Sequence, residues 1–102
     1  MAVTAQVSSD GHEVTINVSG RFDFSAHQQF RRAHEENAAP GRRFVVNLKG
    51  AEYMDSSALG MLLVLREQVG GESNRSVRIT NCRDELRTIF SIANFDKLFA
   101  ID

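Results

Sequence analysis

The sequence predicts an α/β fold, in which a mixed sheet of four to five strands packs against about three helices. Short apolar stretches with strand-like patterns alternate along the chain with stretches whose apolar residues recur at helical spacing. This alternation is typical of α/β domains with partly parallel strand pairing. The length of 102 residues suits one domain, which we place at residues 1–102.

The first elements are predicted to be two antiparallel strands. Residues 3–7 alternate apolar and polar side chains, and so do residues 14–18, with the turn signal Asp10-Gly11 between them. We expect Gly20 to end the second strand and residues 21–23 to lead away from it.

A helix is predicted next. Ser25 and Gln28 have the spacing of a capping box, which satisfies free N–H groups at a helix start. Pro40-Gly41 is expected to end this helix. Its inner face comprises Ala26, Phe30 and Ala33.

The middle of the chain predicts a central strand and a second helix. Residues 44–48 form a short apolar run, whose length and β-branched content are typical of a central strand covered on both faces. Residues 49–55 are expected to form a loop, and a helix then begins near Asp55 or Ser56 and stops at Gly70-Gly71. Its apolar residues include Ala58, Leu59, Leu62, Leu63, Leu65 and Val69.

The last third predicts a strand over residues 76–80 and a short helix from about Asp84. A final strand is expected over residues 98–101. The inner face of the short helix comprises Leu86, Ile89, Phe90 and Ala93.

Composition argues against several classes of partner. The net charge is −1 and the basic residues are scattered, so we expect neither a nucleic acid nor a membrane partner. The single cysteine, Cys82, fits a reducing compartment, and the N-terminus lacks the pattern of a signal peptide. No apolar run approaches the length of a membrane span. We therefore expect a cytoplasmic protein.

No pattern of residues predicts catalysis. His12, His27 and His34 lack the spacing of metal ligands and are expected at the surface. Cys82 has no sequence pattern indicating a nucleophilic pair, so a small buried or half-buried core residue is the better interpretation. The sequence has no Gly-rich phosphate loop or recognisable glycosidase carboxylate pair. We expect no catalytic residues, metal or cofactor, and no enzyme activity.

The segment 53–60, Tyr-Met-Asp-Ser-Ser-Ala-Leu-Gly, is the candidate functional site. Asp and Ser are preferred N-caps, so a plain helix start would account for much of it. Three features favour more than a cap. Three cap-competent residues stand in succession, Gly60 costs about 1 kcal/mol relative to Ala unless close backbone approach requires it, and the first helical turns are apolar nearly all round.

A hydroxyl at this position suits a phosphorylation switch. A phosphate adds about −1.5 to −2 charge, which a helix N-terminus tolerates within the fold. A partner docked on the neighbouring apolar surface would meet new charge and bulk. Asp55 and Asp23 would add to the negative field. From the residues alone, the choice between Ser56 and Ser57 stays open.

Several motifs resemble those of the STAS-domain anti-sigma factor antagonist (anti-anti-sigma factor) family. They are the strand 44–48, the segment 53–60 with Asp-Ser-Ser-x-Leu-Gly at its centre, and residues 19–23, which are similar to the family's Gly-x-x-Asp element. The third predicted helix and residues 95–99 also follow the family's course. The resemblance covers nearly the whole chain and implies a STAS-like fold.

The resemblance also implies a mechanism. A partner anti-sigma factor with serine kinase activity would phosphorylate Ser56, and a serine phosphatase would reverse this. The unphosphorylated form would bind the anti-sigma factor and release its sigma factor. By the resemblance, Ser57, Leu59 and Gly60 belong to the docking surface and Asp23 and Asp55 to its acidic flank. We expect a monomer when the protein is free.

Two departures from the family pattern qualify this expectation. Ala58 stands where the family often has Gly, and the added methyl is expected to narrow partner choice. Many members also carry a final helix, whereas this sequence stops at Asp102, which would leave one side of the sheet less covered. The alternative function is a non-catalytic STAS subunit or scaffold of a signalling or lipid-transport ATPase complex, without phosphorylation control.

Overall fold

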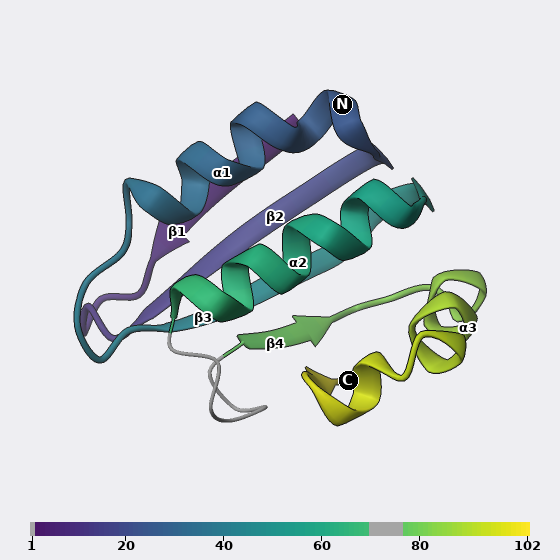
Figure 1. The fold of residues 1–102 in the computed structure, drawn as a ribbon. Coiled ribbons are helices and arrows are strands. Elements are labelled where there is room, and N and C mark those ends of the chain that lie inside the picture. The colour runs from purple at the N-terminus through teal and green to yellow at the C-terminus, as the bar shows by residue number, and fades with distance from the viewer. Residues whose placement is uncertain (1, 70–76) are drawn as a thin grey trace.

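The computed structural model describes residues 2–69 and 77–102 (Figure 1). Within them, five strands form one sheet in the order β1-β2-β3-β4-β5. The elements along the chain are β1 (Ala2–Val7), β2 (Glu13–Phe22), the 3₁₀ turn η1 (Phe24–Ala26), α1 (His27–Glu35), β3 (Arg43–Met54), α2 (Ser56–Gln68), β4 (Val77–Thr80), α3 (Asp84–Ile92), the 3₁₀ turn η2 (Phe95–Lys97) and β5 (Ala100–Ile101). This arrangement confirms the predicted α/β class.

The sheet is mixed, as predicted. β1 and β2 pair antiparallel around a turn in which Gly11 has a φ of 77°, whereas β2, β3, β4 and β5 pair in parallel. Parallel neighbours require crossover connections, and α1 and α2 supply those on either side of β3. The parallel pairing brings the ends of β2 and β3 to the same edge of the sheet.

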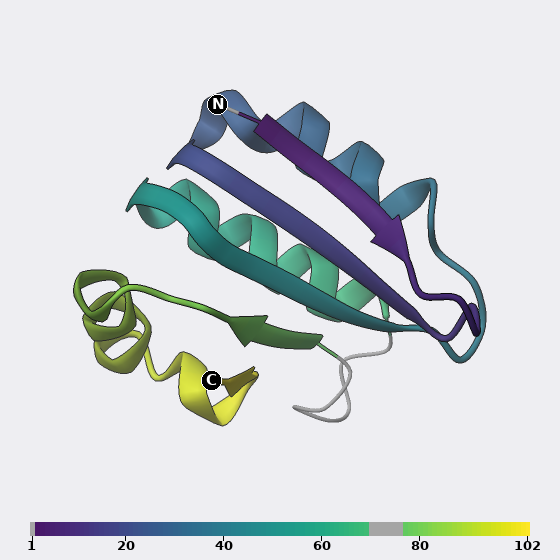
Figure 2. The same cartoon turned by 180° about the vertical axis from the view of Figure 1, so that it is seen from behind.

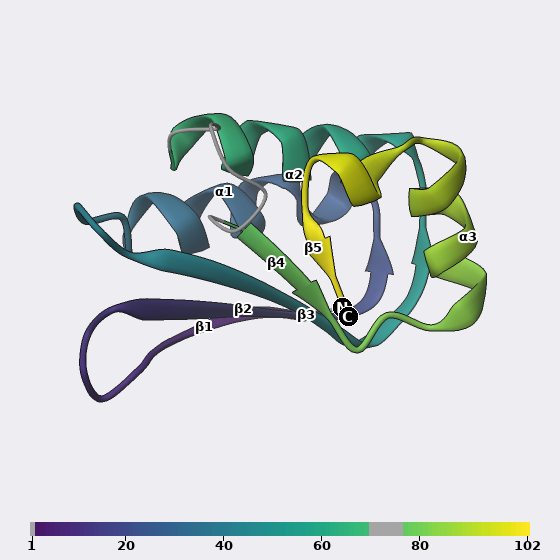
Figure 3. The ribbon, with the colours of Figure 1, turned by 90° about the horizontal axis from the view of Figure 1, so that it is seen from below.

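Helices α1 and α2 cover one face of the sheet, and Figures 2 and 3 show the opposite face without a helix across it. The inner side chains of β2 and β3 are buried against the helices. The prediction that the central strand is covered on both faces is therefore wrong. Val45 points to the outer side yet is only 9% exposed, because it lies between its paired neighbours Thr15 and Arg78.

The outer face is held by a chain of side-chain amides. Asn81 Nδ2 donates to Asn47 Oδ1 at 3.0 Å, and Asn47 Nδ2 donates to Asn17 Oδ1 at 3.0 Å. Asn17 Nδ2 in turn donates to Thr4 Oγ1 at 3.4 Å. These bonds link β1, β2, β3 and the residue after β4, and they explain how polar side chains are accommodated on this face.

Two strand boundaries differ from the prediction. Residues 49–54 belong to β3 instead of a loop, and β2 passes through Gly20 to Phe22. Gly20 has a φ of 76° beside a register shift, so it marks a bulge and not the strand end. Pairing of Phe22 with Met54 extends both strands, which is a long-range effect.

The helices bury the predicted apolar residues with some corrections. α2 buries the predicted Ala58, Leu62 and Leu65, and α3 buries Leu86 and Phe90. Met61 is buried in addition, whereas Leu63 is 38% exposed and lies off the inner face of α2. α1 ends at Glu35, before Pro40-Gly41, and it buries His34 at 3% exposure. The expected surface position of His34 is thus wrong, because the residue lies one helical turn after Phe30 on the inner face.

The end of the chain contains a short helix followed by a minimal strand. α3 begins at Asp84 as predicted, and the rings of Phe90, Phe95 and Phe99 stack in succession. The final strand is limited to Ala100–Ile101. The predicted stop at Gly70-Gly71 and the first residue of the 76–80 strand lie outside the described residues. No helix in the described part is long and apolar enough to cross a membrane.

Candidate functional site

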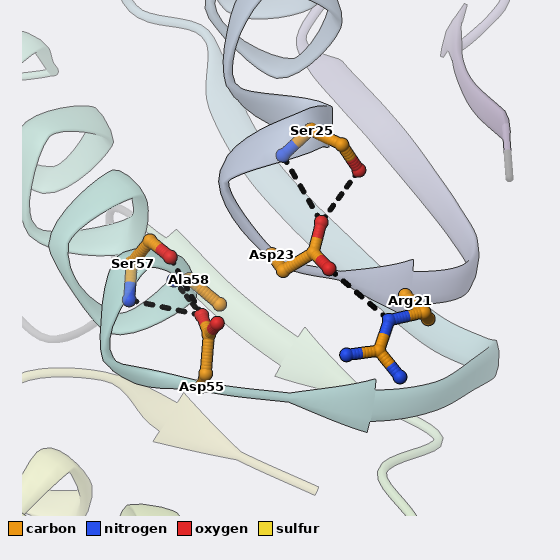
Figure 4. Close-up of polar contacts among 6 residues, drawn as sticks. All are labelled: Arg21, Asp23, Ser25, Asp55, Ser57 and Ala58. Atoms are coloured by element: carbon orange, nitrogen blue, oxygen red, sulfur yellow. Dashed lines mark hydrogen bonds and ion pairs between the residues drawn. The ribbon is translucent and has the colours of Figure 1, made fainter.

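Two helix starts lie beside each other where β2 and β3 end. Phe22 and Met54 are paired across these parallel strands, and each is followed directly by an aspartate, Asp23 or Asp55. η1 begins after Asp23 and α2 after Asp55. The topology therefore places both candidate acidic residues on one edge of the sheet, as Figure 4 shows.

The two aspartates form the same local structure. Asp23 has φ −134° and ψ −167°, and Asp55 has φ −133° and ψ −170°. In each case Oδ1 accepts the backbone N–H of the serine two positions later, Ser25 or Ser57, at 3.0 Å. The same oxygen accepts the hydroxyl of that serine, at 2.5 Å for Ser25 and 2.7 Å for Ser57. Both turns are aspartate caps reinforced by a serine.

This geometry corrects the predicted capping box. Asp23, and not Ser25, accepts the free N–H at the start of η1. Ser25 is instead the donor, since its hydroxyl is directed to the carboxylate. At the second helix start, Asp55 accepts the N–H groups of Ser57 and Ala58, which confirms the predicted beginning of the helix.

The middle residue of each turn is presented to solvent. Ser56 is exposed and begins α2, and no hydrogen bond of its hydroxyl is found among the described residues. Ser57 is half-buried and its hydroxyl donates to Asp55. Phe24, the counterpart of Ser56 in the first turn, is 70% exposed and stacks on His27 with ring centroids 5.2 Å apart. An exposed hydroxyl and an exposed aromatic ring thus occupy equivalent positions in the two turns.

A groove of about 310 Å³ lies between α1 and α2, next to these turns. Its apolar lining includes Phe24, Phe30, Met61 and Val64, of which Val64 is 51% exposed. The groove is also lined by three side chains of α1, His27, Arg31 and His34, and by Ser57 and Gly60 of α2. Phe24 and Val64 were not predicted as groove residues. Their positions, one beside the aspartate turn and one on the apolar helix, could have indicated this role.

Gly60 lies on the open side of α2. A Cβ built at this residue meets no atom within 4 Å. The close backbone approach that the sequence suggested is therefore not made by this chain. Leu59, another predicted docking residue, is half-buried and packs against the core. Of the predicted docking residues, Ser57 and Gly60 line the groove.

The acidic flank is asymmetric. The hydroxyl of Ser25 lowers the pKa of Asp23, and the Arg21 guanidinium, 3.2 Å from Oδ2, lowers it further. Arg21 also lies over the Tyr53 ring, 3.8 Å from its centroid, which fixes the cation beside the site. Asp55 has no ion pair among the described residues. Asp23 therefore contributes less net negative field than its sequence position suggested.

The described residues hold no group of three or more side chains suited to a metal ion. Cys82 is half-buried, as predicted, and burial raises the pKa of its thiol to about 11. Ser56 is exposed, and its neighbour Ser57 lines the apolar groove.

Comparison with known proteins extends these observations. Residues 5–100 match the family model described as "Mlab, STAS domain". A STAS-domain containing protein of Pseudomonas aeruginosa (strain UCBPP-PA14) is 55% identical over 101 residues, covering 99% of each chain. The structure of the anti-sigma factor antagonist SpoIIAA in its unphosphorylated form has a TM-score of 0.70 at 17% identity, covering 99% of this chain and 87% of that one. The phosphorylated form of the Bacillus cell fate determinant SpoIIAA has a TM-score of 0.67 at 17% identity, covering 99% and 91%.

Proposed function

The chain belongs to the STAS domain family, and on that premise we propose that it is an anti-sigma factor antagonist switched by phosphorylation of Ser56. In this proposal the unphosphorylated protein binds an anti-sigma factor with serine kinase activity and thereby releases a sigma factor. Phosphorylation abolishes binding, and a serine phosphatase restores it. The likeness to SpoIIAA in both phosphorylation states supports the fold on which this mechanism depends.

The observation that carries the proposal is the exposed Ser56 hydroxyl at the first residue of α2. A kinase must bring this oxygen to the γ-phosphate, so the acceptor has to be accessible and free of strong competing bonds. Ser56 meets both requirements among the described residues. Ser57 meets neither, because it is half-buried and its hydroxyl donates to Asp55 at 2.7 Å. The geometry therefore favours Ser56 as the acceptor.

The groove between α1 and α2 supports the binding half of the proposal. Its apolar lining begins beside Ser57 and Gly60, which lie within about one helical turn of the proposed acceptor. A partner that fills the groove would lie against Ser56. A phosphate there would add about −1.5 to −2 charge at the edge of an apolar contact, where desolvation is costly. The fold tolerates the same charge because it stands at a helix N-terminus.

The test is affinity capture of the tagged full chain from its native cells, with phosphosite mass spectrometry of the captured protein. We expect one phosphate on Ser56 and capture of a serine kinase by the unphosphorylated form. Ser56→Ala should lose the phosphate, whereas the matched control Ser57→Ala should keep it. Undiminished phosphate in Ser56→Ala would exclude the assigned site.

A second variant separates the switch from the helix cap. Ser56→Asp places a carboxylate at the helix N-terminus, so the circular-dichroism spectrum and unfolding midpoint should stay close to those of the unchanged protein. Capture of the kinase should nevertheless be lost. If the chain captures an ATPase complex, carries no phosphate in cells and binds equally well as Ser56→Asp, the function is instead that of a constitutive subunit or scaffold.

A further inference from the structure

β1 is an edge strand without the usual protection against pairing. It has one neighbour, β2, and forms the long edge of the sheet, as Figure 2 shows, while the opposite edge is the two-residue β5. Its sequence, Ala-Val-Thr-Ala-Gln-Val, contains no charged residue and no proline, and its register with β2 runs without a bulge. Natural sheets normally have charged residues, prolines or bulges on a long edge strand, and these prevent association with another strand.

The free hydrogen-bonding groups of this edge belong to alternate residues. Ser8 donates its N–H to the Glu13 carbonyl at 2.8 Å, which orients the backbone of even-numbered residues in β1 toward β2. The N–H and C=O groups of Val3, Ala5 and Val7 therefore face away from the sheet. The side chains of the same three residues stand on the helix-covered side, since their partners in β2 include the buried Val14 and Val18.

We infer that β1 pairs with β1 of a second copy of this chain in antiparallel fashion, with Ala5 on the two-fold axis. This register joins Val3 to Val7 of the other copy and Ala5 to its own equivalent. Each of these pairs would exchange backbone hydrogen bonds, because all three residues have outward-facing amides. Apolar residues would meet apolar ones on the inner side, and Thr4 would meet Gln6 on the outer side. The result is a continuous ten-stranded sheet.

The helices support this geometry. α1 packs against β1 and β2, so pairing of the edges would bring the two α1 helices antiparallel, about two strand spacings or 10 Å apart. Helices pack at about 8–10 Å. Ala33 lies in the groove between α1 and β1, so a small side chain would stand where the two α1 helices meet.

The charges on this side of α1 are self-complementary. Arg32 and Glu36 line the same groove beside β1 and are 64% and 66% exposed, with 3.9 Å between Nε and Oε1. A two-fold axis would set Arg32 of one copy against Glu36 of the other, twice. This complementarity identifies the occupant of the edge as a second copy of this chain. Both Ser56 sites would stay open, at opposite ends of the dimer.

Sedimentation velocity over a range of concentrations tests the inference on the purified, unphosphorylated chain without any partner. The unpaired edge of β1 leads us to expect a concentration-dependent dimer, in place of the free monomer expected from the sequence. Ala5→Pro should be a folded monomer, because the lost N–H and the proline ring face away from β2. A wild-type monomer at every concentration up to the solubility limit would overturn the inference, as would a dimer that Ala5→Pro leaves unchanged.

Charge reversal provides a test that does not depend on the proline. Arg32→Glu should weaken dimerisation about tenfold, since the axis makes each substitution act twice, and Arg32→Glu with Glu36→Arg should restore it. Arg31→Glu is the matched control, because Arg31 faces the α1–α2 groove and not β1. Equal weakening by Arg31→Glu and Arg32→Glu, or no restoration in the double variant, would contradict the pairing. The experiment is independent of phosphorylation, so it is unaffected by the outcome at Ser56.

Discussion

Replacing Gly60 with alanine should raise the stability of the fold while weakening partner binding. Gly60 lies within α2, five residues after the Asp55 cap, and a Cβ at this position meets no atom within 4 Å. The added methyl therefore has no steric cost inside the chain. Alanine also restricts the unfolded chain more than glycine does.

The expected size follows from helix propensity alone. In a helix interior, alanine is favoured over glycine by about 0.8–1 kcal/mol. With a urea m-value of about 1 kcal/mol/M for a small domain, the unfolding midpoint should rise by about 0.8–1 M. Binding should change in the opposite direction, because the methyl projects into the groove that Gly60 helps to line.

Urea unfolding followed by circular dichroism measures the first effect, and capture of the anti-sigma partner measures the second. Gly50→Ala is the matched control, because its Cβ would lie 2.8 Å from Ser19 Cβ and 3.2 Å from Ser19 Cα. Overpacking of this kind costs about 1–3 kcal/mol, so that variant should be less stable. If Gly60→Ala lowers the free energy of unfolding, the space beside Gly60 is not open to a methyl group. If the Gly60→Ala protein is more stable and still binds its partner normally, the groove is not the docking surface.

Two further predictions concern titratable side chains. Burial lowers the pKa of His34 below its ordinary 6.5, with Glu35 raising it and Arg31 lowering it. The unfolded chain then binds a proton at His34 before the folded chain does, so the unfolding free energy should fall as pH decreases from 7 through 6.5 toward the folded pKa. His34→Gln should remove this component in urea titrations at pH 7.5, 6.5 and 5.5, whereas an unchanged slope would contradict it. Burial also raises the pKa of Cys82 from 9.0 to about 11, so native alkylation at pH 8 should be about 100-fold slower than in the urea-unfolded chain. Equal rates would show that the thiol is not protected.

Local patterns in the sequence were sufficient for most elements. Three examples depend only on neighbours within a few residues. They are the alternation at residues 14–18, the aspartate before α2, and the helical spacing of Leu86 and Phe90. Such patterns predict the element and its inner face because strand and helix periodicities differ. The family resemblance then pointed to the correct fold and to the segment 53–60 as the candidate site.

The predictions failed where distant segments decide local structure. Residues 49–54 lack the regular alternation of a strand, yet they continue β3 because Ser19 to Phe22 pair with them. His34 is buried because the sheet and α2 close over the inner face of α1. Ser25 has the spacing of an N-cap, but Asp23 is the residue that caps the turn. Its carboxylate accepts hydrogen bonds from both the backbone N–H and the hydroxyl of Ser25.

The sequence by itself determined most elements, most of their inner faces and the segment 53–60 that contains two candidate serines. The tertiary structure decided which of these features meet. Parallel pairing of β2 with β3 sets the turns of Asp23 and Asp55 side by side, and the packing of α1 beside α2 opens a groove next to Ser56. The division has a physical cause: helix and strand periodicity and capping act over one to four residues, whereas strand register and helix packing join residues about thirty positions apart.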